Sequence, residues 1–132
     1  MSIGAEAQRL CDAYAAAYRV GDAAGCAALF VPDGWLFSPY NPPAQGRPAI
    51  EAVHREWTAL EGSDTKSLTV MEAGASGDVG WCLVVYTDAP GLDEGSSVNI
   101  LERQADGGWL IRACSVTPND APLGGDEDDT EG

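Results

Sequence analysis

The sequence contains few basic side chains. Seven lysines and arginines stand against 21 aspartates and glutamates, which gives a formal net charge of −14 with the single histidine counted as neutral. A surface this acidic repels phosphate backbones and anionic lipids. We therefore expect binding neither to nucleic acid nor to membrane surfaces.

Part of this acidity lies at the end of the chain. Positions 119–132 hold 6 of the 21 acids and no base. Because the segment has little apolar surface to bury and many like charges, we expect a disordered acidic tail. It lacks the regular aspartate spacing and the fixed glycine of an EF-hand loop, which argues against a calcium site.

Long apolar runs are also missing. The longest, such as Trp81–Tyr86, are far shorter than the roughly 18–20 residues of a membrane-spanning helix. The first residues carry neither the basic start nor the apolar block of a secretory signal, so we expect a cytoplasmic protein. A length of 132 residues with 45% hydrophobic content is typical of one folded domain with its own core.

Motifs for metals and cofactors are absent from the sequence. The cysteines Cys11, Cys26, Cys82 and Cys114 are too far apart for a zinc knuckle or a Cys-x-x-Cys motif, and one histidine cannot complete a Cys/His set. No Gly-x-Gly-x-x-Gly or phosphate loop occurs. We expect free, buried thiols, no metal and no cofactor. A cysteine nucleophile would need His54 beside it as a base.

The first half of the sequence has helical periodicity. Apolar residues recur at helical spacing over Ala5–Arg19. A capping aspartate then favours a second helix over Ala23–Phe30, which Pro32 should end. A third helix is expected to open at Arg47, with a proline in its first turn, and to end near Gly62.

The second half favours strands. After a short strand at Trp35–Phe37, apolar runs bounded by turn residues predict three or four more, at Ser67–Ala73, Val79–Asp88, Ser96–Gln104 and Trp109–Thr117. Helices followed by an antiparallel meander predict an α+β fold. Three N-terminal helices should cover one face of a curved antiparallel sheet.

Three segments, in a fixed order, carry a family resemblance. They are Tyr14–Asp33, with a Gly-Asp break and a Leu-Phe-x-x-Asp entry into a strand; Gly46–Ile50, a glycine-led helix start; and Leu101–Ile111, a closing hairpin. With these segments the chain resembles the nuclear transport factor 2-like superfamily, the cone fold of ketosteroid isomerase, scytalone dehydratase and SnoaL-like polyketide cyclases. The resemblance implies a cone domain over 1–118 with a deep apolar cavity, followed by the tail at 119–132.

The strand expected at Val79–Asp88 indicates whether the sheet packs against a second protein chain. Its residues Cys82, Val84 and Tyr86 share one face, and the odd-numbered residues share the other, yet both faces are apolar. Helices can cover only one face of the sheet. Because members of the superfamily pair sheets back to back, we expect a homodimer through the sheet.

The resemblance to ketosteroid isomerase implies roles for three residues. Tyr14 falls at the tyrosine donor, Asn99 at the second donor and Ser38 at the carboxylate base. A serine cannot accept a proton near neutral pH without help, so steroid isomerisation by that mechanism is not expected. Tyr14 as a core tyrosine and Asn99 as a hydrogen-bonded structural amide are the alternatives.

Three further residues each admit two interpretations. His54 is either a third catalytic group, as histidine is in scytalone dehydratase and several cyclases of this fold, or a partly exposed structural histidine. Arg112 is either a cation inside the cavity that binds an anionic ligand or a residue of the rim or interface. Asp33 could replace the missing base, although an exposed capping residue is favoured.

The expected catalytic residues are Tyr14, Asn99 and His54. The other expected ligand-binding residues share a place on the cavity wall or rim, and they are Tyr18, Ser38, Tyr40, Val53, Trp57, Val84, Tyr86, Arg112 and Cys114. The sequence favours a protein that binds a hydrophobic small molecule, with acid–base chemistry of isomerase, cyclase or dehydratase type on a carbonyl compound left open. The alternative is a non-catalytic ligand-binding or homodimerisation domain.

Overall fold

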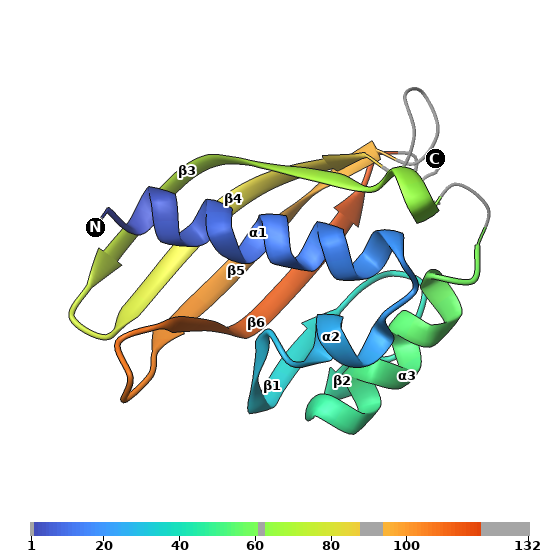
Figure 1. Cartoon of the computed structure of the whole chain (residues 1–132), viewed down its shortest axis with the longest axis horizontal. Helices are drawn as coiled ribbons and strands as arrows, with labels where there is room; N and C mark the ends of the chain where they lie inside the picture. Colours follow the sequence, from blue (N-terminus) through green and yellow to red (C-terminus); the bar gives the residue numbers. More distant parts are fainter. Residues whose placement is uncertain (1, 61–62, 88–93, 120–132) are drawn as a thin grey trace, which may run out of the picture.

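Helices come first in the chain and most of the sheet follows them (Figure 1). The computed structural model describes residues 2–60, 63–87 and 94–119. In chain order the elements are α1 (Ile3–Arg19), α2 (Ala23–Ala27), β1 (Phe30–Phe37), β2 (Ala44–Gln45), α3 (Arg47–Trp57), a 3-10 turn η1 (Ser63–Thr65), β3 (Ser67–Ser76), β4 (Val79–Thr87), β5 (Glu94–Arg103) and β6 (Trp109–Pro118). The expected α+β fold is confirmed.

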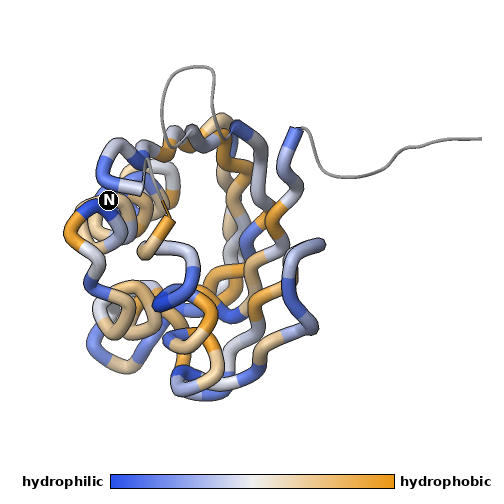
Figure 2. Tube along the Cα trace, turned by 90° about the vertical axis from the view of Figure 1, so that its right-hand side faces the viewer, coloured by the Kyte–Doolittle hydropathy of each residue, from blue (hydrophilic) through white to orange (hydrophobic). Residues whose placement is uncertain are grey.

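One six-stranded sheet, in the order β2-β1-β6-β5-β4-β3, carries the three helices on one side. Figure 2 shows this division, with helices to the left and strands to the right. The β3–β4, β4–β5 and β5–β6 pairs are antiparallel, as expected for a meander. The β1–β6 pair is parallel, which corrects the expectation of a wholly antiparallel sheet. No hairpin joins β1 to β6, so nothing local forces an antiparallel pairing.

Helix α1 covers much of the inner face of the sheet. Ser2 caps its N-terminus, since the Ser2 hydroxyl accepts a hydrogen bond of 3.1 Å from the Ala5 N–H. The buried residues share one face of the helix, and they are Ala7, Cys11, Ala15 and Tyr18. Their spacing places Cys11 and Tyr18 toward the sheet, as the helical periodicity predicts.

The segment after α2 differs from the sequence expectation. Helix α2 ends at Ala27 and not at Phe30, which begins β1 and lies opposite Ile111 of β6. The first strand therefore starts five residues before Trp35, where it was expected. Pro32 does not end a helix. It lies in an irregular part of β1, between the pairs made by Phe30 and Trp35, where its missing N–H costs no ladder hydrogen bond.

Helix α3 is shorter than expected. Gly46 precedes it with a φ of 88°, a left-handed conformation that favours glycine, and the Gly46 N–H donates to the Gly34 carbonyl at 2.8 Å. The helix ends at Trp57 and not near Gly62, which lies outside the described residues. At its end the Thr58 hydroxyl donates to the His54 carbonyl.

The central strands have one buried and one exposed face, as their alternation predicts. In β4 the inner residues Cys82, Val84 and Tyr86 are buried, whereas the outer residue Trp81 is 40% exposed. Strand β5 follows the same pattern. Asp88 and residues 120–132, where the tail was expected, lie outside the described residues.

Two bulges interrupt the strand alternation. Met71 in β3 and Arg112 in β6 have no residue opposite them in the neighbouring strand. Bulges bend a strand and increase its twist, so both contribute to the curvature of the sheet. Within residues 2–60, 63–87 and 94–119, no helix combines the length and the apolar character that crossing a bilayer requires.

Candidate ligand-binding cavity

A cavity of about 500 Å³ lies between the inner face of the sheet and the helices. This volume is within the range of small-molecule sites. Most of its wall is apolar or aromatic, with side chains such as Leu10, Phe30, Leu68 and Ile111. The expected site residues that line it are Tyr14, Tyr18, Tyr40, Trp57, Tyr86, Asn99 and Cys114.

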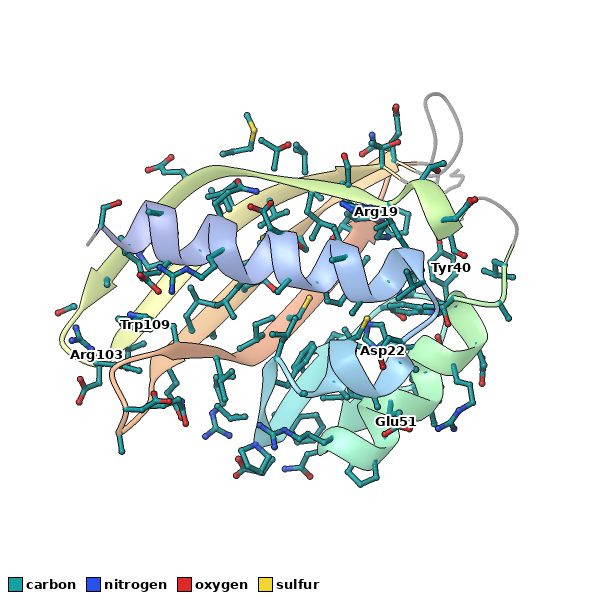
Figure 3. The ribbon with its side chains drawn as sticks, viewed as in Figure 1. Arg19, Asp22, Tyr40, Glu51, Arg103 and Trp109 are labelled. Carbon is teal, nitrogen blue, oxygen red and sulfur yellow. The ribbon has the colours of Figure 1, made fainter. Side chains whose placement is uncertain are left out.

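Exposed lining residues mark the mouth of the cavity. Tyr40 is 55% exposed and Leu60 is 64% exposed, and both contribute to the wall. At this mouth the Trp57 indole donates to Asn41 Oδ1 at 3.1 Å, and Asn41 Nδ2 donates to Glu56 at 3.4 Å. In Figure 3, Tyr40 lies at the Arg19 end of α1, far from Arg103 and Trp109 at the other end of the sheet.

His54 is fully buried behind Tyr14 and does not line the cavity. Of the two interpretations of His54, the structural one was therefore wrong in giving the ring partial exposure. The ring is oriented by the Ile50 carbonyl, 2.8 Å from His54 Nδ1. Burial lowers the pKa of His54 to about 4, with a smaller contribution from the charge of Lys66, so the ring is neutral at pH 7.

The tautomer of His54 determines what Tyr14 offers a ligand. Because His54 Nδ1 lies against a carbonyl oxygen, Nδ1 carries the proton and Nε2 is an acceptor. Tyr14 Oη lies 2.6 Å from Nε2, so the phenol donates its only proton to the imidazole. Toward the cavity, Tyr14 then presents acceptor lone pairs, which is the opposite of an oxyanion-hole donor.

Asn99 forms a polar site on the floor of the cavity with its neighbours. It is 6% exposed, and its Nδ2 donates to Ser97 Oγ at 3.1 Å. A hydrogen bond also joins it to Cys82 on the neighbouring strand. No described residue donates a hydrogen bond to Asn99 Oδ1. A buried amide oxygen in this situation suits a ligand donor.

Cysteines occupy much of the same wall. Cys11 of α1 hydrogen-bonds to Cys82, and this bond together with burial raises the pKa of Cys11. All four cysteines are free thiols. Within the part of the chain that the structure describes, no three His, Cys, Asp or Glu side chains are arranged to hold a metal ion.

Lys66 is a cavity residue that the sequence analysis missed. It lies between η1 and β3, lines the cavity and is only 7% exposed. Its ammonium nitrogen lies 4.4 Å from the ring centroid of Tyr18 and 4.4 Å from that of Tyr86. Both rings face the cation, as in other cation–π contacts. The sequence contains a single lysine, and this was the one signal that could have drawn attention to Lys66.

No family model and no curated protein matches the chain. A ketosteroid isomerase-like protein from Erwinia carotovora atroseptica has a similar structure, with a TM-score of 0.70 and 18% identity over 89% of this chain and 97% of its own. ActVI-ORFA from Streptomyces coelicolor has a TM-score of 0.66 and 23% identity over 92% of this chain and 100% of its own.

A third solved structure carries the fold in its description. It is an NTF2-like protein with a cystatin-like fold from Novosphingobium aromaticivorans, with a TM-score of 0.66 and 22% identity over 90% of this chain and 83% of its own. The chain has the fold of the nuclear transport factor 2-like (NTF2-like) proteins. The expected resemblance is confirmed at the level of the fold, and the activity has to be argued from the cavity itself.

Arg112, one of the expected ligand-binding residues, does not line the cavity because of a local backbone feature. Arg112 is the extra residue of the β6 bulge, so Ile111 and Cys114 both line the cavity and Arg112 does not. It forms ion pairs with Glu102 at 2.8 Å and with Asp33 at 2.9 Å. The Asp33 side chain is 70% exposed and pairs with this arginine. The exposure agrees with the favoured interpretation, but among the described residues Asp33 Oδ1 accepts from Arg112 and not from the N–H of a helix start.

The other misplaced residues are Ser38, Val53 and Val84. Ser38 follows the end of β1, where its hydroxyl accepts a hydrogen bond of 3.3 Å from the Tyr40 N–H. It borders a separate shallow depression beside β6. Val53 and Val84 are buried in the hydrophobic core and do not line the NTF2-like cavity.

Proposed function

We propose that the protein binds a small, largely apolar molecule in the cavity between its sheet and helices. The observation that carries this proposal is a volume of about 500 Å³ with a mostly apolar wall and a few inward polar groups. Tyr14 and Asn99 both present hydrogen-bond acceptors there, and the Ser97 hydroxyl supplies a donor. A ligand with one or two polar groups on an apolar body matches this set.

Two adjacent serines on β5 allow a matched test. Ser97 is buried and lines the cavity, whereas Ser96 is exposed on the opposite face. The neutral fluorophore N-phenyl-1-naphthylamine serves as the probe. We expect it to bind the wild-type protein and the Ser96→Trp variant with similar affinity and to lose at least about tenfold, or 1.4 kcal/mol, in Ser97→Trp. Equal binding by both variants would place the probe outside the cavity.

The pair formed by Tyr14 and His54 supports a second candidate, proton transfer on a carbonyl compound. In this step the α-carbon of a ketone gives its proton to Tyr14 Oη as the phenolic proton passes to His54 Nε2 over 2.6 Å. The electron pair left on carbon forms an enolate, whose oxygen the Ser97 hydroxyl can bind. The low pKa of His54 disfavours this transfer, so only acidic α-protons are suitable.

Deuterium exchange tests this second candidate. We expect the wild-type protein to accelerate exchange of the α-protons of 2-tetralone in D₂O, followed by NMR, and Tyr14→Phe to lose that acceleration. Exchange at the buffer rate in the wild-type protein would remove the catalytic candidate and leave ligand binding in place.

The outer sheet face supports a proposed partner, a second copy of this chain. Five large apolar residues of β4 and β5 are 38–54% exposed there, and they are Trp81, Leu83, Val85, Val98 and Ile100. A continuous apolar face of this kind is typical of an interface. We expect a dimer by sedimentation and a monomer for Ile100→Glu, with Met71→Glu on the outlying β3 as the control. A monomeric wild-type protein at micromolar concentration would reject the interface.

A further inference from the structure

A polar pair on β5 interrupts the apolar wall of the cavity. Ser97 and Asn99 lie two positions apart in the strand, so both side chains point to the inner face of the sheet. Each is 6% exposed, and both line the cavity. Proteins rarely bury a hydroxyl or an amide unless its hydrogen bonds are made. The bonding capacity that these two side chains have left therefore indicates what a ligand must supply.

The contacts of Asn99 within the protein use the N–H side of its amide. Asn99 Nδ2 donates to Ser97 Oγ at 3.1 Å. The residue also lies opposite Cys82 of β4. Hydrogen bonds from Cys11 and, to a smaller extent, from Asn99 lower the pKa of the Cys82 thiol, as donors to its sulfur do. These contacts occupy the two N–H groups of the amide and leave Asn99 Oδ1 without a donor in the described part of the chain.

Ser97 has the complementary capacity. Its oxygen accepts from Asn99, and among residues 2–60, 63–87 and 94–119 no group accepts the proton of its hydroxyl. Because the oxygen and nitrogen of a side-chain amide are about 2.2 Å apart, Asn99 Oδ1 lies at most about 5.3 Å from Ser97 Oγ. An O–H···O hydrogen bond is about 2.7–2.8 Å long. One ligand oxygen between these two atoms can therefore bond to both of them.

We propose that Ser97 and Asn99 together bind one hydroxyl group of the ligand, so that the cavity selects an alcohol or phenol with an apolar body. The inference rests on the proposed binding function and names the chemical class of its ligand. The ligand hydroxyl donates to Asn99 Oδ1 and accepts from the Ser97 hydroxyl. The apolar body of the ligand fills the rest of the cavity.

The same pair disfavours a ligand that can only accept. A ketone of the same size accepts from Ser97, but it brings no proton for Asn99 Oδ1, which then stays buried and unpaired. Sites that hydrogen-bond a ligand hydroxyl discriminate strongly against analogues that lack it, for this reason. One unsatisfied buried acceptor corresponds to a loss of about tenfold or more in affinity.

Two ligands that differ only in this group test the assignment. 2-Tetralol carries a hydroxyl where 2-tetralone carries a carbonyl, on the same bicyclic skeleton. Each is titrated against protein loaded with N-phenyl-1-naphthylamine, and the displacement of that fluorophore gives its Kd. The variants are Asn99→Leu, which replaces the amide with an apolar side chain of similar size, and Ser97→Ala. Ser96→Ala is the control, since Ser96 is exposed on the other face of the same strand.

We expect the wild-type protein to bind 2-tetralol at least about tenfold more tightly than 2-tetralone, and Asn99→Leu to bind the two within about twofold of each other. Ser97→Ala should weaken both ligands, because both accept from its hydroxyl, and Ser96→Ala should change neither.

Three results would overturn the inference and leave the cavity as a ligand site. They are equal affinities of the wild-type protein for the two ligands, displacement of the fluorophore by neither, and an undiminished preference for 2-tetralol in Asn99→Leu. If Asn99→Leu does not fold, as judged by its melting curve, Asn99→Met takes its place. Failure of N-phenyl-1-naphthylamine to bind the wild-type protein would instead reject the binding function itself.

Discussion

The buried imidazole of His54 predicts a loss of stability on mild acidification. The ordinary pKa of a histidine is 6.5, and burial lowers the pKa of His54 to about 4 in the folded protein because it disfavours the charged ring. Between these two values the unfolded chain binds a proton that the folded protein does not. Stability from this group is therefore complete above pH 6.5 and is lost as the pH falls toward 4.

The size of the effect follows from the two pKa values. Linkage gives a loss in the free energy of unfolding of about 2 kcal/mol between pH 7 and pH 5, and about 3 kcal/mol by pH 4. His54 is 0% exposed, so solvent screening does not reduce this value appreciably. Carboxylates titrate over part of the same range, which makes a variant without the imidazole necessary as a reference.

Urea denaturation at pH 7 and pH 5 provides the assay, with the wild-type protein compared with His54→Gln. A glutamine oxygen can still accept the Tyr14 hydrogen bond, but it does not titrate. We expect the wild-type protein to lose about 2 kcal/mol more than the variant over this interval. Because His54 is the only histidine, its ring protons also give an unambiguous NMR titration. Equal losses in both proteins, or a ring that titrates near 6.5, would refute the reasoning.

Three smaller perturbations test other contacts. Tyr14→Phe leaves the buried Nε2 of His54 without its donor, and we expect urea midpoints to report a loss of about 1–3 kcal/mol; an unchanged midpoint would contradict the contact. Cys26 is fully buried with a pKa raised to about 12 by burial, so iodoacetamide at pH 8 should label it only after unfolding, as mass spectrometry would show. Labelling of the folded protein would count against that burial. Gly46→Ala should lower the melting temperature through a cost of about 1–2 kcal/mol at a φ of 88°, whereas Gly4→Ala in the open face of α1 should not.

Local patterns predicted the elements whose faces are defined by simple periodicity. The spacing of apolar residues located α1, and the alternation in β4 placed Cys82 inside and Trp81 outside. These features depend only on neighbours in the chain, so sequence alone carries them. The wall positions of Tyr14 and Asn99 were anticipated through the family resemblance and agree with the cavity lining.

The errors arose where tertiary contacts override local pattern. Phe30 continues a helical spacing, but its pairing with Ile111 draws it into β1. Strict alternation predicted that Arg112 and Cys114 would share one face of β6. A bulge at Arg112, which no sequence signal indicated, breaks this alternation. The contact of His54 with Tyr14 joins residues 40 positions apart, and no local signal announces such a contact. Lys66 was overlooked because a lysine beside a turn usually points to solvent.

The extra residue in β6 has a consequence for how the cavity can change in size. Arg112 contacts no ligand-facing surface, yet its insertion bends the strand that supplies Ile111 and Cys114 to the wall. Removing that one residue would bring Ile111 and Ala113 next to each other, still opposite Leu101 and Ile100, so the strand would keep its inward and outward faces and lose the bend of the bulge. A single-residue insertion or deletion at such a bulge would therefore change the shape of the cavity without changing the identity of any side chain that lines it.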